Sequence, residues 1–163
     1  MSRMKIAVPA LLVAAALLAG CKTTEPAPEP APPPPPVVQD QALSADGLFA
    51  FGKGDLADIS DSGRAELDTF AAILLGGAPY EIVHVIGHSD RIGNAKANLD
   101  LSNRRARSVR DYLVQQGVPA ERITAVGRGS VEPLVECEDM EREPLIECLA
   151  PNRRVEIRIV PAG

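Results

Sequence analysis

Aromatic residues are scarce in this chain, whose 163 residues include no Trp, two Tyr and three Phe. A hydrophobic core must therefore be built from Val, Ile, Leu and Ala. That is enough for one modest domain, which a covalent cross-link would help to stabilise. Basic residues are also in the minority, with 17 Lys and Arg against 22 Asp and Glu and a net charge of -5. Because phosphate binding requires a basic face, this balance argues against a nucleic-acid partner.

The N-terminus lacks an apolar run long enough for an ordinary membrane span, which needs about 20 residues. The run from Ile6 to Leu18 is shorter, contains Pro9 and is followed by small residues. A transmembrane helix is the alternative, but Leu18-Ala19-Gly20-Cys21 resembles the lipobox of bacterial lipoprotein signal peptides. This resemblance implies cleavage before Cys21 and lipidation of that cysteine, whose acyl chains would anchor the protein. Lys22 is not the Asp of an inner-membrane retention signal, so the outer membrane is the expected location.

Cysteine is limited to three residues. If Cys21 is lipidated, Cys137 and Cys148 remain as an even pair in an exported protein, and the compartment outside the cytoplasm is oxidising. A metal site is the alternative, but no His and no further Cys lies between them. We therefore expect a disulfide, which for a loop of this size contributes about 3 kcal/mol in the chain-entropy model.

A proline-rich stretch separates the N-terminal signal from the rest of the chain. From Glu25 to Pro36 the residues are only Pro, Ala and Glu, and Pro32 to Pro36 are five consecutive prolines. Such a segment cannot bury a core and should extend as polyproline II. The sequence thus predicts a signal peptide at 1–20, a lipidated cysteine with a semi-rigid linker at 21–41, and a folded domain at 42–163.

Strand and helix patterns alternate through the folded domain. Apolar residues at helical spacing, closed by glycines, predict helices, and β-branched runs predict strands. Alternation of this kind favours an α/β sandwich with a βαβαββ order, a mixed four-stranded sheet and helices on one face. The predicted strands are 47–51, 80–88, 123–126 and 154–160, and the predicted helices are 61–75 and 94–116.

The second predicted helix carries an arginine where its buried stripe is expected. At about 100° per residue, Arg105 falls about 40° from Leu101, on the side of Tyr112, and Asn98 also falls inside the stripe. A desolvated guanidinium is costly without a partner, so this position requires an anion or a cleft. Two interpretations stay open. Arg105 could form a structural pair with Asp90, or the two residues could together bind a zwitterion.

Four stretches of the folded domain match the motifs of a known family. They are Gly87-His88-Ser89-Asp90-Arg91-Ile92-Gly93, Asn98, Leu101-Ser102-Asn103-Arg104-Arg105-Ala106 and Asn152-Arg153-Arg154-Val155-Glu156. On these motifs, the chain from about Ala42 to Val160 resembles the OmpA-like peptidoglycan-binding domain family, which includes the peptidoglycan-associated lipoproteins. Within that family, the segment with the two cysteines is most similar to the C-terminal domain of OmpA.

The resemblance implies a non-catalytic site for the diaminopimelate residue of the peptidoglycan stem peptide. In that mode Asp90 receives the ammonium group and Arg105 the carboxylate. Asn98, Leu101 and Arg153 match other positions of the motifs, although Ala97 replaces the Tyr that usually precedes the Asn. The family pattern predicts no cofactor and no metal. The implied role is to tether the outer membrane to peptidoglycan, and the Tol-system proteins are possible further partners.

Two alternatives come from the residues around Asp90. Gly87-His88-Ser89-Asp90-Arg91 is partly similar to the nucleophile elbow of hydrolases, which would indicate a cell-wall hydrolase. However, Arg91 stands where the tight turn needs Gly. His84, His88 and Asp90 share one face of an extended strand and could bind zinc. A third alternative is a protein that acts mainly through Tol-system partners.

Overall fold

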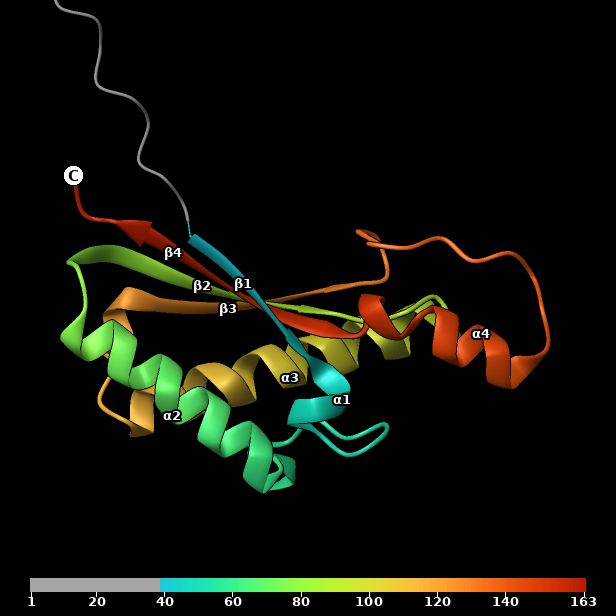
Figure 1. Ribbon diagram of the computed structural model, residues 1–163, viewed down its shortest axis with the longest axis horizontal. Coiled ribbons are helices and arrows are strands. Elements are labelled where there is room, and N and C mark those ends of the chain that lie inside the picture. The colour runs from blue at the N-terminus through green and yellow to red at the C-terminus, as the bar shows by residue number, and fades with distance from the viewer. Residues whose placement is uncertain (1–38) are drawn as a thin grey trace, which may run out of the picture. The chain divides into compact units, whose positions relative to one another are not determined.

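The structure, a computed structural model, describes residues 39–163, which form a four-stranded sheet flanked by helices (Figure 1). The strand order is β1-β4-β2-β3. Both β1 and β2 pair antiparallel with β4, whereas β2 and β3 are parallel. Three 3-10 turns, 56–58, 120–122 and 150–152, complete the fold. The elements are β1 (Gln39–Ser44), α1 (Ala45–Leu48), α2 (Asp61–Gly76), β2 (Tyr80–His88), α3 (Ala95–Gln115), β3 (Ile123–Gly129), α4 (Arg142–Cys148) and β4 (Arg154–Pro161).

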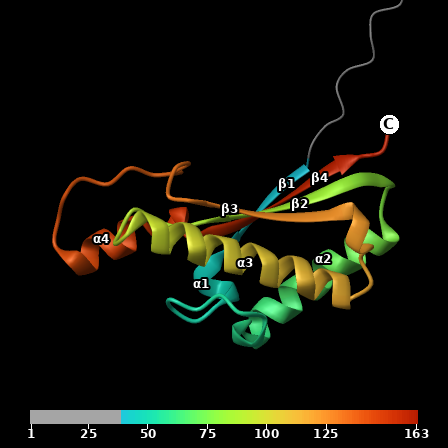
Figure 2. The same ribbon diagram turned by 180° about the vertical axis from the view of Figure 1, so that it is seen from behind.

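Helices α2 and α3 lie against the same face of the sheet, and the view from behind shows α3 running along β2 and β3 with α2 beside it (Figure 2). The core lies between these layers and is mainly aliphatic, although Phe49, Phe70, Tyr80 and Tyr112 also belong to it. The predicted α/β class, with a mixed sheet and helices on one face, is confirmed. Core residues include Leu67, Leu74, Val83, Val85, Val109, Leu113, Val155 and Ile157.

Helix α3 is fixed at both ends by the residues that predicted it. The side chain of Asn94 caps its N-terminus by accepting hydrogen bonds from the amides of Lys96 and Ala97. Gly117, with a φ of 107°, follows its last turn. The helix approaches the sheet closely, because a Cβ atom on Gly87 would collide with the backbone of Ser102. This close approach sets the depth of the α3 side chains above the end of β2.

The strand predicted at 47–51 is wrong. Residues 45–48 form α1 instead, where the hydroxyl of Ser44 accepts a hydrogen bond from Gly47 N at 3.4 Å. The first strand is β1, which begins inside the stretch assigned to the linker. In β1 only Leu43 places a large apolar side chain in the core. A strand with so few apolar residues at the edge of a sheet gives little periodicity to detect.

The N-terminal predictions lie outside the described residues. They are the signal peptide at 1–20, the lipidation site Cys21 and the linker up to residue 38. In the part of the chain that the structure describes, no helix combines the length and apolar character needed to cross a membrane.

A disulfide closes the segment between β3 and β4. Cys137 and Cys148 are bonded, as the sequence predicted, and α4 lies between them. Arg91, in the turn after β2, donates from Nη2 to the carbonyl of Cys137 at 2.9 Å and to Oδ1 of Asp139 at 3.2 Å. The bridged segment is therefore attached to the turn that follows β2.

Candidate functional site

A pocket of about 110 Å³ lies beyond the end of β2. Its walls come from the turn after β2, the first turns of α3, the segment that precedes α2, helix α4, and the residue just before β4. All five residues that the sequence predicted to bind a ligand line it. These residues are Asp90, Asn98, Leu101, Arg105 and Arg153. Side chains from distant parts of the chain thus meet at one site.

Arg105 is buried as the helical periodicity predicted, with 2% of its surface exposed. Its Nε donates to the carbonyl of Lys53 at 2.8 Å, and its guanidinium carbon lies 5.7 Å from the ring centroid of Phe49. Its two terminal nitrogens have no hydrogen-bond partner among residues 39–163, and Arg105 is one of the residues that line the pocket. Burial lowers the pKa of Arg105, repulsion from Arg153 lowers it further, and Asp46 and Asp90 partly offset both effects. The arginine is therefore a desolvated cation with unused donors.

Asp90 does not pair with Arg105. The structural ion pair between these two residues, one of the two interpretations of the sequence, is therefore wrong. Its Oδ2 accepts from Nη1 of Arg153 at 2.8 Å, and its Oδ1 accepts from the amide of Ile92 at 2.9 Å. Arg153 is shared, because its Nε and Nη2 also contact Oδ2 of Asp46 at 2.9 and 2.8 Å. Burial alone would lower the pKa of Arg153, but the hydrogen bonds to the two carboxylates raise it above its ordinary value. Arg105 is left without a carboxylate of its own.

Asn98 shapes the turn that carries Asp90. Its Nδ2 donates to the carbonyl oxygens of Asp90 and Ile92, each at 3.0 Å. Both acceptors are backbone groups near the pocket, so Asn98 fixes the backbone from which the Asp90 side chain projects. The structure therefore shows a positioning contact for Asn98, whereas Leu101 supplies apolar wall.

The segment before α2 forms a rim that sequence comparison did not assign to the site. Arg105 holds it at Lys53, and Ser108 Oγ donates to the carbonyl of Gly54 at 2.7 Å. Phe51 lines the pocket from this rim and is 78% exposed, although every other aromatic side chain is at most 8% exposed. An exposed aromatic side chain beside a pocket lined by charged residues offers apolar surface to the aliphatic part of a ligand.

Helix α4 forms the remaining wall through Arg142 and Ile146. The carbonyl of Ile146 accepts from Nη1 of Arg153 at 2.9 Å, so the same arginine attaches both Asp90 and α4. Sequence reasoning missed Arg142, Ile146 and Asp46. One available signal for Arg142 was that it is the only basic residue in the acidic stretch between the two cysteines.

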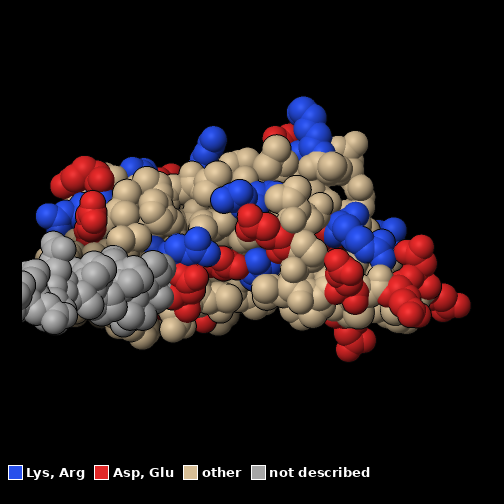
Figure 3. Space-filling model, turned by 90° about the horizontal axis from the view of Figure 1, so that it is seen from above, with Lys and Arg blue, Asp and Glu red and all other residues tan. Residues whose placement is uncertain are grey.

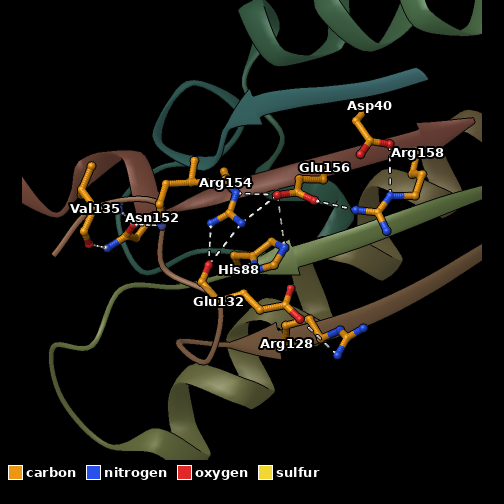
Figure 4. Close-up of polar contacts among 10 residues, drawn as sticks. Asp40, His88, Arg128, Glu132, Val135, Asn152, Arg154, Glu156 and Arg158 are labelled. Carbon is orange, nitrogen blue, oxygen red and sulfur yellow. Dashed lines mark hydrogen bonds and ion pairs between the residues drawn. The ribbon is translucent and has the colours of Figure 1, made fainter. Parts of the chain in front are cut away.

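A second polar cluster lies on the opposite face of the sheet (Figure 4). His88 is 1% exposed, and its Nε2 lies 3.6 Å from Oε1 of Glu156, which accepts from Nε of Arg154 at 2.7 Å. Burial and then repulsion from Arg154 lower the pKa of His88. Glu156 and Glu132 oppose this shift, whereas Arg128 adds to it. His88 is therefore neutral at neutral pH and turned away from the pocket.

The zinc and hydrolase alternatives lack the geometry that they require. His84 Nδ1 lies 2.8 Å from the hydroxyl of Thr124, His88 faces Glu156, and Asp90 faces Arg153. Among the residues that the structure describes, no three His, Cys, Asp or Glu side chains converge as metal ligands would. The hydroxyl of Ser89 is buried without a hydrogen-bond partner in the described chain, so His88 does not activate it as a base.

Comparison with known proteins identifies the family of the chain. The model of the OmpA family matches residues 48–145. The chain belongs to the OmpA family. Outer membrane protein A of Yersinia pseudotuberculosis is 47% identical over 121 residues, which are 72% of this chain and 33% of that protein. The corresponding protein of Escherichia fergusonii is 43% identical over 72% of this chain and 49% of its own length. This OmpA-family chain thus spans between a third and a half of these relatives.

Solved structures support the same assignment. The cell wall anchor of the type VI secretion system (T6SS) from Pseudomonas aeruginosa superimposes with a TM-score of 0.63 and 30% identity, covering 77% of this chain and 82% of that one. The peptidoglycan-associated lipoprotein of Burkholderia pseudomallei superimposes with a TM-score of 0.55 and 25% identity, covering 69% of this chain and 86% of that one. The periplasmic domain of Helicobacter pylori MotB, at 22% identity, covers 76% of each chain with a TM-score of 0.62, which shows the shared fold. Family membership confirms the prediction that the OmpA-like domain is not an enzyme.

Proposed function

We propose that this OmpA-family domain binds peptidoglycan non-covalently through the diaminopimelate residue of the stem peptide. The observation that carries the proposal is that Arg105, whose two terminal nitrogens have no partner among residues 39–163, lines the same pocket as Asp90. A carboxylate suits the two-pronged guanidinium, and Asp90 can still accept from an ammonium group because each of its oxygens has a further lone pair. The free side-chain end of diaminopimelate carries both groups on one carbon.

The roles of the pocket residues follow from their contacts. Arg105 would bind the carboxylate and Asp90 the ammonium, while Arg153 and Asn98 hold Asp90 in place. Leu101 and the exposed ring of Phe51 would contact the methylene groups of the ligand. The pocket needs no cofactor for this role, because binding requires only hydrogen bonds and apolar contact.

Sedimentation with purified sacculi tests the proposal. Asp90→Asn and Arg105→Met should each weaken binding to diaminopimelate-type sacculi by about a hundredfold, since each removes one partner of a desolvated charge pair. Arg107→Gln, an exposed arginine on the same helix, is the matched control and should bind normally. Free diaminopimelate should compete, and sacculi with lysine in its place should not bind. Normal binding by both folded pocket variants would refute the assignment.

We further propose that the chain is an outer-membrane lipoprotein anchored through Cys21, with this domain in the periplasm. The lipobox-like sequence Leu18-Ala19-Gly20-Cys21 and the outer membrane proteins among its relatives support this location. Labelling with radioactive palmitate should mark the wild-type protein and leave Cys21→Ser unlabelled. Recovery of Cys21→Ser in the outer-membrane fraction, in cells whose peptidoglycan has been digested, would contradict the anchor. A Tol-system partner stays a prediction.

A further inference from the structure

The pocket holds more positive charge than a zwitterion needs. Three arginines, Arg105, Arg142 and Arg153, line it, and the carboxylates that face them are Asp90 and Asp46. Arg153 is neutralised by both carboxylates, and the end of diaminopimelate adds one positive and one negative charge. Among these groups, Arg142 therefore has no direct carboxylate partner after that end has bound.

Of these three arginines, Arg142 has no role in the proposed binding of the side-chain end of diaminopimelate. It is the first residue of α4, and its side chain is exposed to solvent and lines the pocket. Among residues 39–163 it forms no ion pair, although it lies in an acidic segment, and Figure 3 shows acidic side chains gathered at one end of the view. Its acidic neighbours are Glu136, Glu138, Asp139, Glu141, Glu143 and Glu147. An unpaired arginine in such a segment is available to a ligand.

The backbone of α4, which carries Arg142, is held beside the pocket by two contacts. The disulfide between Cys137 and Cys148 closes the segment around α4, and Ile146, one turn after Arg142, receives the hydrogen bond from Arg153. Arg153 also holds Asp90, so one side chain sets the distance between α4 and the ammonium site. A ligand that bridges both would meet a preorganised arrangement.

We propose that Arg142 binds a second carboxylate of the wall peptide, one that lies outside the side-chain end of diaminopimelate. The domain would then prefer stem peptides whose remaining carboxylates are free over those in which they are amidated. This proposal depends on the proposed function, because it takes diaminopimelate as the group bound between Asp90 and Arg105. In this proposal, the disulfide-bridged segment contributes to the selection of the ligand.

The test compares two synthetic tripeptides, L-alanyl-γ-D-glutamyl-diaminopimelate and the same peptide with every carboxylate amidated except the one at the side-chain end. Calorimetric titration of the full chain should show about tenfold tighter binding of the free peptide, as expected for one charge-assisted contact at an exposed position. In Arg142→Gln the two peptides should bind equally, at the affinity of the amidated one. Arg107→Gln, which makes the same charge change elsewhere on the surface, should keep the full preference.

Each outcome separates this proposal from the one on which it depends. If Arg142→Gln keeps the tenfold preference, Arg142 is not the selecting residue, and loss of both peptides in Arg105→Met would still support the diaminopimelate site. Equal binding of the two peptides by the wild-type protein overturns the selection proposal alone. If the wild-type protein binds neither peptide, both proposals fail.

Discussion

Replacing Arg105 by Met should leave the domain folded, with a free energy of unfolding within about 1 kcal/mol of the wild type or higher, while it weakens sacculus binding by about a hundredfold. Arg105 is 2% exposed, and no carboxylate of the described residues lies within hydrogen-bond distance of it. Burial is the main cause of its lowered pKa, which means that the fold disfavours the charged form. Met has an unbranched side chain that occupies the space of the arginine's methylene groups without a charge, and it leaves the space of the guanidinium group vacant.

The opposing contributions can be compared from the contacts. Met loses the hydrogen bond to Lys53, about 1.5–3 kcal/mol for a charged donor, and the contact with the Phe49 ring, about 0.5–2 kcal/mol. In return, the folded state no longer carries the desolvation penalty of the buried guanidinium group, which is on the order of several kcal/mol. Lys53 lies in an exposed segment, so water can replace the lost donor at its carbonyl. We therefore expect the free energy of unfolding to stay within about 1 kcal/mol of the wild type or to increase.

Urea unfolding and sacculus binding of the same preparations measure the two effects. Arg107→Met, on the exposed side of α3, is the control. It should change stability by no more than about 0.5 kcal/mol and should retain binding. A loss of more than about 3 kcal/mol in Arg105→Met would show that the buried arginine is structural. Unchanged binding would show that its free donors are not used by the ligand.

Three further predictions concern the surroundings of the site. Arg153→Met should lower the free energy of unfolding by about 3 kcal/mol, because it leaves the carboxylate of Asp90 buried without its cation; a loss below 1 kcal/mol in urea would contradict this. The double variant Cys137→Ser/Cys148→Ser should lose about 2–3 kcal/mol and also bind sacculi less tightly, because α4 is no longer held at the pocket; undiminished binding would argue against α4 as a wall. The lowered pKa of His88 means that its stability contribution is complete above the ordinary value of 6.5 and is lost as the pH falls toward the folded-state pKa. The urea concentration at the unfolding midpoint should therefore decrease as the pH is lowered from about 7 to about 5, and it should decrease less in His88→Leu than in the wild type. Parallel pH profiles of the two proteins would contradict this prediction.

The sequence predicted the elements whose periodicity is strong. Helix α3 follows its apolar stripe from cap to glycine, and β2 follows its run of β-branched residues. The stripe also placed Arg105 inside, because helical geometry decides which side of α3 each residue occupies. These features depend on residues close together in the chain, and local patterns describe them adequately.

The parts that the sequence missed depend on contacts between distant residues. β1 is held mainly by its ladder with β4, and a strand of this kind needs few apolar side chains of its own. Asp90 lies 63 positions from its cation, Arg153, and no periodicity reports a pair at that separation. Arg142 enters the pocket only because the disulfide and Arg153 bring α4 there.

The adjacent residues Arg153 and Arg154 show why the register of β4 decides the chemistry of the site. Successive side chains near a strand point to opposite faces, so one arginine reaches Asp90 in the pocket and the next reaches Glu156 beside His88. The pairing of Val155 with Leu43 and with Gly87 fixes this register. A shift by one residue would turn Arg154 toward the pocket in place of Arg153, and it would also move the core side chains Val155 and Ile157 to the other face of the sheet. The ladder that stabilises the sheet therefore also determines which arginine serves the pocket, and the paired sequence Arg153-Arg154 could not reveal that choice by itself.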